Sequence, residues 1–193
     1  MKDIVLEVSK IKKICKEIAS TLETRFTNSD SVPVFLGILK EGLRFLNDVI
    51  SYYSLPVIFD TVKISTYQGS GETGVIVLEK DINVDIENKD VVLFDCVCSS
   101  GLVISYLKTY LQIKYKPRSI TIAVLIDKKS ARKTTIAPDI VGYYLQKNRF
   151  ILGYGLGYHE LARNINFIFS PSFEYIDKCD QALKINKYKE TRR

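Results

Sequence analysis

The sequence is poor in the residues that most often build nucleophilic and metal sites. It contains no tryptophan, one histidine and four cysteines, and no two cysteines form a CxxC pair. Any catalytic triad or histidine-based metal centre would need His159, which no nucleophile motif accompanies, so we expect it on the surface. For the four cysteines we predict reduced, partly buried thiols with neither a disulfide nor a zinc ion. These are Cys15, Cys96, Cys98 and Cys179.

Long apolar segments are also absent. No apolar run reaches the roughly 18 to 20 residues that span a bilayer, and the first residues lack the apolar stretch of a signal peptide. We therefore expect a cytoplasmic protein without a membrane partner. The 193 residues, 46% hydrophobic and 26% charged, predict one sizeable globular domain over 1–193.

The charge excess is moderate, because 28 basic residues face 22 acidic ones. Part of it lies in a tail that we expect to be solvated, about residues 184–193, and part at Lys128, Lys129, Arg132 and Lys133. Such an excess permits phosphorylated ligands or nucleic acid and requires neither.

Apolar residues recur with helical or strand periodicity along most of the chain. Helices are predicted at about 6–26, 42–53 and 102–113, and the pattern permits a short one near 158–163. Strands are predicted at 34–39, 57–65, 75–78, 91–94, 120–126, 140–144, 150–153 and 167–169. Strands that alternate with helices indicate a mainly parallel sheet covered on both faces, with ligands beyond the carboxyl ends of its strands.

Residues 91–101 combine a predicted buried strand with a polar turn just before a helix. The run Val-Val-Leu-Phe ends at Asp95, and Ser99-Ser100-Gly101 precedes the helix, whose first amides can bind an anion. Cys96 and Cys98 are two apart in this strand, so we expect both to point the same way as a buried apolar pair. The turns 39–42 and 95–101 both follow strands, and we expect them to form one shared site.

Two lysines follow predicted strands, and each has two interpretations. Lys40 can bind phosphate or lie solvated, and Lys128 can donate to a carbonyl or phosphate or pair with Asp127 or another surface acid. The glycines at 69, 71 and 74 have the letters of a dinucleotide motif, but a strand follows them. A flexible loop between antiparallel strands, able to act as a lid, is the better interpretation.

Six motifs stand in the order found in hypoxanthine-guanine phosphoribosyltransferases, and residues about 5–170 resemble that family. They are Leu39-Lys-Glu-Gly42, Thr66-Tyr67, Asp95 to Gly101, Asp127-Lys128, Phe150 to Tyr158, and Arg163. The resemblance implies the type I phosphoribosyltransferase fold, an α/β architecture whose mainly parallel twisted sheet is flanked by helices and carries a mobile lid loop and a small hood.

The resemblance also implies a reaction of purine salvage. A purine nitrogen displaces pyrophosphate from 5-phosphoribosyl 1-diphosphate, Mg²⁺ neutralises the diphosphate, and a nucleoside 5′-monophosphate forms. The expected partners are a purine base or nucleotide and 5-phosphoribosyl 1-diphosphate or pyrophosphate. Family members assemble as dimers or tetramers, so a homo-oligomer is also expected.

On the phosphate side, the family pattern gives roles to five residues. Leu39 and Lys40 would form the pyrophosphate loop, often with a cis peptide bond, and Arg163 would contact pyrophosphate. Ser100 and Gly101 would receive a phosphate with the helix amides.

On the purine side, the family pattern implies that Lys128 would donate to the 6-oxo group of the purine and that Phe150 would stack on the ring. The backbone of Ile151 would bind the ring edge. Thr66 and Tyr67 would begin the lid.

The segment at 95–103 departs from the family pattern of acids. Asp95 keeps the first carboxylate, with an indirect role at the metal, whereas Cys96 replaces the second acid and Ser99 replaces the proton-accepting aspartate. Val103 replaces a phosphate-binding hydroxyl. A neutral serine is a poor proton acceptor, and loss of general-base assistance costs about 10² to 10⁴-fold in rate.

Two further positions differ. Gly157 stands where the family has an aspartate that helps to hold magnesium, and Glu41 replaces a small residue of the pyrophosphate loop. We expect Glu41 to repel pyrophosphate, and the missing acids to weaken metal binding. The sequence therefore predicts a transferase homologue with impaired or lost catalysis. The alternative is a non-catalytic regulator or partner subunit that binds a nucleotide or phosphate ligand, and an RNA-binding regulator is a third hypothesis.

Overall fold

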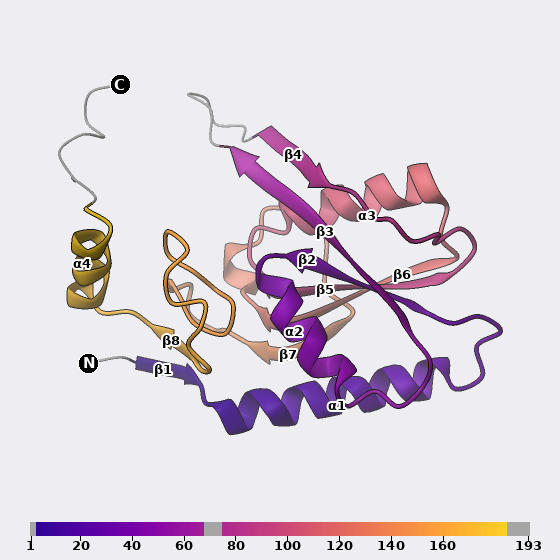
Figure 1. Ribbon diagram of the computed structural model, residues 1–193, viewed down its shortest axis with the longest axis horizontal. Coiled ribbons are helices and arrows are strands. Elements are labelled where there is room, and N and C mark those ends of the chain that lie inside the picture. The colour runs from indigo at the N-terminus through magenta and orange to yellow at the C-terminus, as the bar shows by residue number, and fades with distance from the viewer. Residues whose placement is uncertain (1–2, 68–74, 185–193) are drawn as a thin grey trace.

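The computed structural model describes residues 3–67 and 75–184 (Figure 1). A six-stranded sheet has the order β4-β3-β2-β5-β6-β7, and a separate two-stranded sheet pairs β1 with β8. Only β4 is antiparallel to its neighbour in the larger sheet; the other pairs are parallel. The strands are β1 (Asp3–Leu6), β2 (Val34–Leu39), β3 (Ile58–Tyr67), β4 (Val75–Lys80), β5 (Asp90–Cys98), β6 (Ser119–Asp127), β7 (Ile140–Tyr144) and β8 (Ile168–Ser170).

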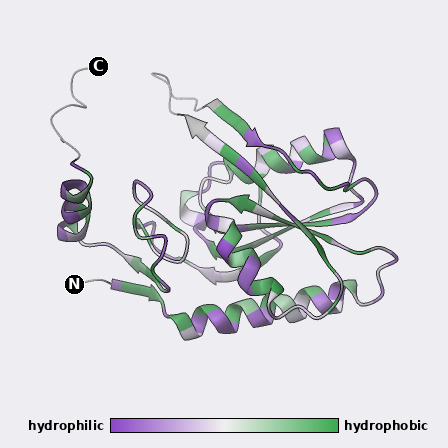
Figure 2. Cartoon of the chain, viewed as in Figure 1, coloured by the Kyte–Doolittle hydropathy of each residue, from purple (hydrophilic) through white to green (hydrophobic). Residues whose placement is uncertain are grey.

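Helices cover both faces of the larger sheet (Figure 1). The α-helices are α1 (Val8–Phe26), α2 (Glu41–Ile50), α3 (Leu102–Tyr115) and α4 (Phe173–Ala182), with a 3₁₀ turn at Lys129–Ala131. Apolar residues of α1 and α2 pack with Phe35, Phe94 and Leu125 on one face. Apolar residues of α3 pack with Leu36 and Leu93 on the other. Along α1, apolar and polar residues alternate as stripes, because only one side of the helix meets the sheet (Figure 2).

The fold class predicted from the sequence is confirmed. The predictions for β2 and β7 have the observed bounds, and α1, α2, α3, β3, β4, β5, β6 and β8 lie within a few residues of the predicted elements. The antiparallel β3–β4 pair agrees with the interpretation of the glycines at 69–74 as part of a connecting loop. That loop, the expected lid, and the basic tail after residue 184 lie outside the described residues.

The segment 150–163 differs from its prediction. Residues 150–153 form no strand, because only the isolated bridges Leu152–Phe169 and Gly153–Leu156 occur there. Residues 158–163 form turns instead of a helix, and His159, Glu160 and Ala162 have φ of 44°, 71° and 69°. Such left-handed residues reverse the chain repeatedly, which no regular element allows. With β1, β8 and α4, this looped segment forms the hood at the left of Figure 1.

All four cysteines are buried. Cys96 packs in the core under α1 and α2, whereas Cys98 packs in the core under α3, so the prediction that they point the same way is wrong. The alternation of β5 side chains between the two faces of the sheet is interrupted at the carboxyl end of the strand.

Among the described residues, no helix is long and apolar enough to cross a membrane.

Candidate functional site

A pocket of about 210 Å³ opens at the carboxyl edge of the larger sheet, where β2 and β5 end. The turns after these two strands do line one site, as the sequence predicts. The close fit of α2 against β5 fixes their spacing, because a Cβ added at Gly42 would lie 2.4 Å from the carbonyl oxygen of Phe94. The polar and charged lining residues are Glu41, Asp95, Ser99 and Ser100.

One end of the pocket is the loop between β5 and α3. Gly101 has φ of 81°, and a Cβ there would lie 2.4 Å from the Thr134 hydroxyl, so only glycine fits without strain. Arg132 holds the loop, since its Nε donates to the carbonyl oxygen of Ser99 at 2.9 Å. Arg132 also pairs with buried Asp127. The loop therefore presents the first amides of α3 to the pocket, where they can bind an anion.

The Ser99 hydroxyl lies in this loop. Among the described residues, the one hydrogen bond of Ser99 is the bond that its carbonyl oxygen accepts from Arg132. Within those residues, no histidine, lysine or carboxylate makes a hydrogen bond to the hydroxyl that could activate it as a proton acceptor.

Asp95 is the one acid of the 95–103 segment, and it lines the pocket floor. Burial and the nearby charge of Glu41 raise the pKa of its carboxyl to about 7, against hydrogen bonds from two backbone amides. Asp95 therefore changes its charge near neutral pH.

Cys96 does not face the pocket. Its side chain is fully buried on the opposite face of β5, with Sγ 3.9 Å from the carbonyl oxygen of Tyr154. Burial raises the pKa of its thiol well above the ordinary value, so the thiol stays protonated. The Cys96 side chain therefore contributes no group to the pocket.

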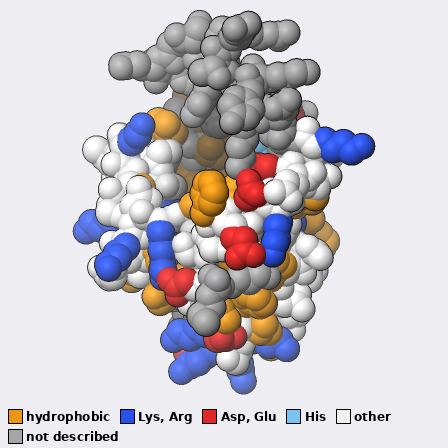
Figure 3. All heavy atoms as spheres, turned by 90° about the vertical axis from the view of Figure 1, so that its left-hand side faces the viewer, with side chains coloured by type: hydrophobic (Ala, Val, Ile, Leu, Met, Phe, Trp, Pro, Cys, Tyr) orange, Lys and Arg blue, Asp and Glu red, His pale blue; other side chains and the backbone are white. Residues whose placement is uncertain are grey.

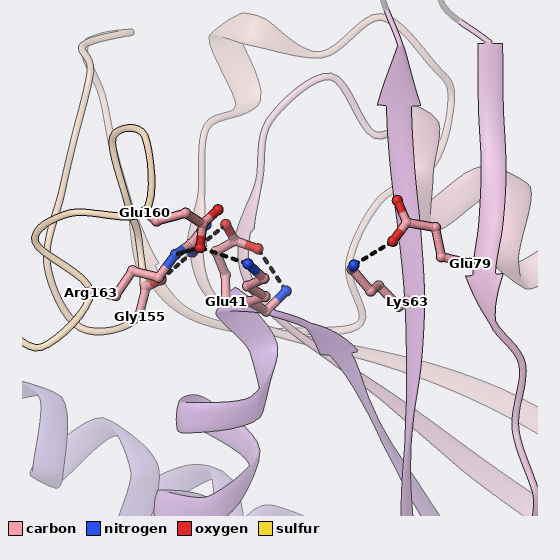
Figure 4. Close-up of polar contacts among 7 residues, drawn as sticks. Glu41, Lys63, Glu79, Gly155, Glu160 and Arg163 are labelled. Carbon is pink, nitrogen blue, oxygen red and sulfur yellow. Dashed lines mark hydrogen bonds and ion pairs between the residues drawn. The ribbon is translucent and has the colours of Figure 1, made fainter. Parts of the chain in front are cut away.

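Beyond the other end of the pocket, two cations meet two carboxylates (Figure 4). Arg163 Nη1 lies 2.7 Å from Glu41 Oε1, and Arg163 Nε lies 3.1 Å from Glu160 Oε2. Lys40 Nζ lies 2.6 Å from the same Glu160 oxygen. These hydrogen bonds, from Lys40 first and then Arg163, lower the pKa of Glu160 to about 2. The Leu39–Lys40 peptide bond is cis, as the resemblance implies.

The residues expected to hold a purine lie beside the carboxyl end of β6. Lys128 is 8% exposed and donates from Nζ to the carbonyl oxygen of Arg149 at 2.8 Å. It does not pair with Asp127, whose carboxylate pairs with Arg132 instead, so that alternative is wrong. Phe150 is 52% exposed, and its ring meets the Tyr158 ring edge-on at 6.1 Å between centroids.

Four other predicted positions do not line the pocket. Ile151 follows Phe150 and is buried. Thr66 and Tyr67 end β3, next to residues outside the described ranges. His159 is exposed in the hood, as predicted.

Comparison with known proteins decides the family. Residues 3–159 match the model of the phosphoribosyl transferase domain. Over 179 residues, the chain is 33% identical to a hypoxanthine-guanine phosphoribosyltransferase of Staphylococcus epidermidis, covering 92% of this chain and 98% of that protein. The Bacillus subtilis protein of the same name is 32% identical over 166 residues, which are 86% of this chain and 90% of the relative. The chain belongs to the hypoxanthine-guanine phosphoribosyltransferase family.

The fold agrees with this membership. A crystal structure of a hypoxanthine phosphoribosyltransferase from Staphylococcus aureus superposes with a TM-score of 0.84 at 32% identity, covering 90% of this chain and 93% of the other. The type I phosphoribosyltransferase fold expected from the motifs is therefore confirmed.

The magnesium ion that the family implies finds few protein ligands in this member. Within residues 3–67 and 75–184, no group of three or more histidine, cysteine, aspartate or glutamate side chains is placed to hold a metal. Glu41 and Asp95 line the pocket, but the Glu41 carboxylate is paired with Arg163. Mg²⁺ is usually held by one or two carboxylates together with substrate phosphates and water, and Asp95 is the pocket carboxylate that can take this part.

Two residues that contact candidate site residues were not predicted as site residues. Glu160 joins Lys40 and Arg163, and Arg132 holds the 99–101 loop. The sequence placed Arg132 only in a basic cluster, and Glu160 reaches Lys40 across 120 positions of the chain. No local pattern could indicate that contact.

Proposed function

We propose that this chain binds purine nucleoside 5′-monophosphates at the carboxyl edge of its sheet and catalyses their formation from 5-phosphoribosyl 1-diphosphate and hypoxanthine or guanine slowly or not at all. The observation that carries the proposal is the contrast at the 99–101 loop. The amides that open α3 there are a donor set suited to a phosphate, yet among the described residues no base makes a hydrogen bond to the hydroxyl of Ser99, which stands at the family's proton-accepting position.

The purine would lie beside Lys128 and Phe150. An ammonium group that now donates to the Arg149 carbonyl can donate to a purine oxygen instead. The exposed Phe150 ring offers a stacking surface. The phosphate would occupy the pocket end at Ser100, Gly101 and the amides of α3.

Proton removal from the purine is the step that we expect to be slowed most, because the general base is missing. A general base contributes about 10² to 10⁴-fold, so a site that keeps its binding groups and loses this one still holds the nucleotide. A non-catalytic regulator or partner subunit that binds nucleotides is the limiting case of this proposal. The family's magnesium is not part of it, and a homo-oligomer remains a prediction.

The charges on the visible surface do not favour the RNA-binding hypothesis. On the face shown in Figure 3, acidic, basic and apolar side chains are interspersed, without an extended field of basic side chains among the described residues. Nucleic-acid binding by the phosphate backbone favours a basic patch or stripe. We therefore propose small nucleotides as the ligands.

Calorimetric titration of the full chain with inosine and guanosine 5′-monophosphates tests the proposal. The expected result is saturable binding of one nucleotide per chain, and inosine without its phosphate should bind at least about tenfold more weakly, because it cannot use the loop. Absence of nucleotide binding, or equal binding of inosine, would contradict the proposal.

A further inference from the structure

The donor groups beyond the Leu39–Lys40 turn converge on a small volume. They are the Arg163 guanidinium, the Lys40 ammonium and the backbone amide of Lys40, which donates to Glu41 Oε2 at 3.1 Å. Two cations and an amide at the start of α2 are a donor set for an anion with several oxygens and more than one charge. We call this group of donors the cation corner.

Two carboxylates of the chain itself accept hydrogen bonds from these donors. The two oxygens of Glu41 accept from the Lys40 amide and from Arg163, and the two oxygens of Glu160 accept from Arg163 and Lys40. Figure 4 shows both carboxylates directed toward the guanidinium of Arg163. The cation corner is thus neutralised by two carboxylates from positions 41 and 160.

Glu41 is the more consequential of the two carboxylates. Its side chain is 34% exposed, against 62% for Glu160, and it lines the same pocket as Asp95. A diphosphate that took Arg163 from Glu41 would leave a partly buried carboxylate without its partner beside a polyanion. Loss of one partner of a desolvated ion pair is costly, and like charges in contact add to that cost.

Gly157 allows Arg163 to reach Glu41. A Cβ at position 157 would lie 2.8 Å from Arg163 Nε and 2.9 Å from Cζ. Arg163 also donates to the carbonyl oxygen of Gly155 at 2.7 Å, which holds the guanidinium in this place. The absence of a side chain at Gly157 therefore leaves room for the Arg163 side chain, and the Glu41 carboxylate pairs with it there.

We propose that Glu41 serves as an internal anion in the cation corner, so that the pocket accepts ligands with a single phosphate at the 99–101 loop and excludes pyrophosphate and 5-phosphoribosyl 1-diphosphate. This inference rests on the proposed function for the identity of the monophosphate ligand. The exclusion of pyrophosphate depends on the cation corner alone.

Calorimetric titration with inorganic pyrophosphate, without purine or metal, tests the inference on the full chain. We expect the unaltered protein to bind pyrophosphate at least about tenfold more weakly than Glu41→Ala does, because the variant frees Arg163 and the Lys40 amide. Glu41→Gln, which keeps the size of the side chain, should show the same direction. Glu17→Ala on α1, where an exposed i,i+4 pair with Lys13 is lost, is the control for net charge and should leave pyrophosphate binding unchanged.

The outcomes are separable. Equal pyrophosphate affinity of the unaltered protein and of the Glu41 variants, with their folded state verified by circular dichroism, would overturn the internal anion. An equal gain in Glu17→Ala would also overturn it, since general charge would then suffice. Failure of inosine 5′-monophosphate to bind would contradict the proposed function. The pyrophosphate titration would still decide whether Glu41 acts as an internal anion.

Discussion

Lys128 lies at the end of β6 with its ammonium group nearly enclosed and its hydrogen bond directed to the Arg149 carbonyl. Its neighbour Lys129 is exposed. The two lysines carry the same charge one residue apart. Substituting each in turn therefore distinguishes a specific contact of Lys128 from general attraction for an anionic ligand.

We predict that Lys128→Ala weakens inosine 5′-monophosphate binding by about tenfold to a hundredfold, the range of a hydrogen bond to a charged group. Lys129→Ala should change the affinity by less than about twofold, because exposed charges are screened. Calorimetry of both variants measures the difference. Equal effects would show that Lys128 contributes charge and no directed contact.

Asp95 gives the site a dependence on pH near neutrality. The pKa of its carboxyl rises from 3.8 to about 7 in the folded protein, first through burial and then through Glu41. Since the folded chain holds this proton more tightly than the unfolded chain, the stabilisation is full below about pH 4 and is lost as pH rises through about 7. Asp81, whose pKa is lowered to about 2, acts in the opposite sense and at lower pH.

We predict that the free energy of unfolding falls by about 2 to 3 kcal/mol between pH 5 and pH 8 through Asp95, and that Asp95→Asn lacks this part of the decrease. Urea unfolding of both proteins at the two pH values gives the comparison. Parallel pH profiles for the two proteins would mean that Asp95 titrates at its ordinary pKa.

At the scale of elements, the contact between α2 and β5 sets the width of the pocket. The Gly42 backbone approaches Phe94 so closely that a Cβ would meet a carbonyl oxygen at 2.4 Å and the Cα of Asp95 at 3.3 Å. Both obstacles are backbone atoms, which cannot move as a side chain does. An added methyl must separate the helix from the strand.

Gly42→Ala is therefore predicted to lower the free energy of unfolding by about 1 to 3 kcal/mol, the range for overpacking. Asn47→Ala, at an exposed position of the same helix, should be neutral or slightly stabilising, because alanine has the higher helix propensity. Thermal or urea unfolding measures both. A Gly42→Ala protein as stable as the unaltered chain would contradict the close fit.

The central strands of the larger sheet, β2, β5 and β6, could be predicted from their apolar runs because each is buried along most of its length. The bounds of β2 follow from six consecutive apolar or small residues after Pro33. The hood could not be predicted in the same way. Residues 151–153 are buried, but the turns at Tyr154, His159 and Glu160 prevent a ladder. Turn conformations of this kind depend on tertiary contacts more than on local propensity.

The sequence also gave no prediction for α4, although its start carries a signal. Ser172 caps the helix, with its hydroxyl accepting from the Tyr175 amide, and it follows Pro171. The helix buries little apolar surface and is supported by i,i+4 pairs such as Glu174–Lys178. Capping rules would have found this helix where hydrophobic periodicity did not.

At the scale of the whole molecule, the site divides into parts that the sequence could and could not assign. Motif order predicted site residues in the 99–101 loop and at Lys128, Phe150 and Arg163; the structure places the loop at the pocket and Lys128 at the end of β6. The pairing of Arg163 with Glu41 and Glu160 joins residues 122 and 3 positions apart, and only the folded chain shows that both carboxylates meet one guanidinium. Likewise, Cys96 stands at an acidic position of the family pattern but packs in the core.

Under the proposed function, the binding surface of this family member is better kept than its chemistry. In that proposal the 99–101 loop, the Phe150 ring and Lys128 bind the nucleotide, while Ser99 stands at the position of the proton acceptor and carboxylates of the chain occupy the cation corner. The proposal therefore predicts binding without efficient turnover.

The most direct test is the rate at which the full chain forms inosine 5′-monophosphate from hypoxanthine, 5-phosphoribosyl 1-diphosphate and magnesium. A typical enzyme turns over at about 10 s⁻¹, and loss of a general base alone lowers that by about 10² to 10⁴-fold, so we predict a rate below about 0.1 s⁻¹. The Staphylococcus epidermidis relative, assayed alongside, serves as the reference. A rate of about 10 s⁻¹ for this chain would contradict the account, because Ser99 would then leave the family reaction intact.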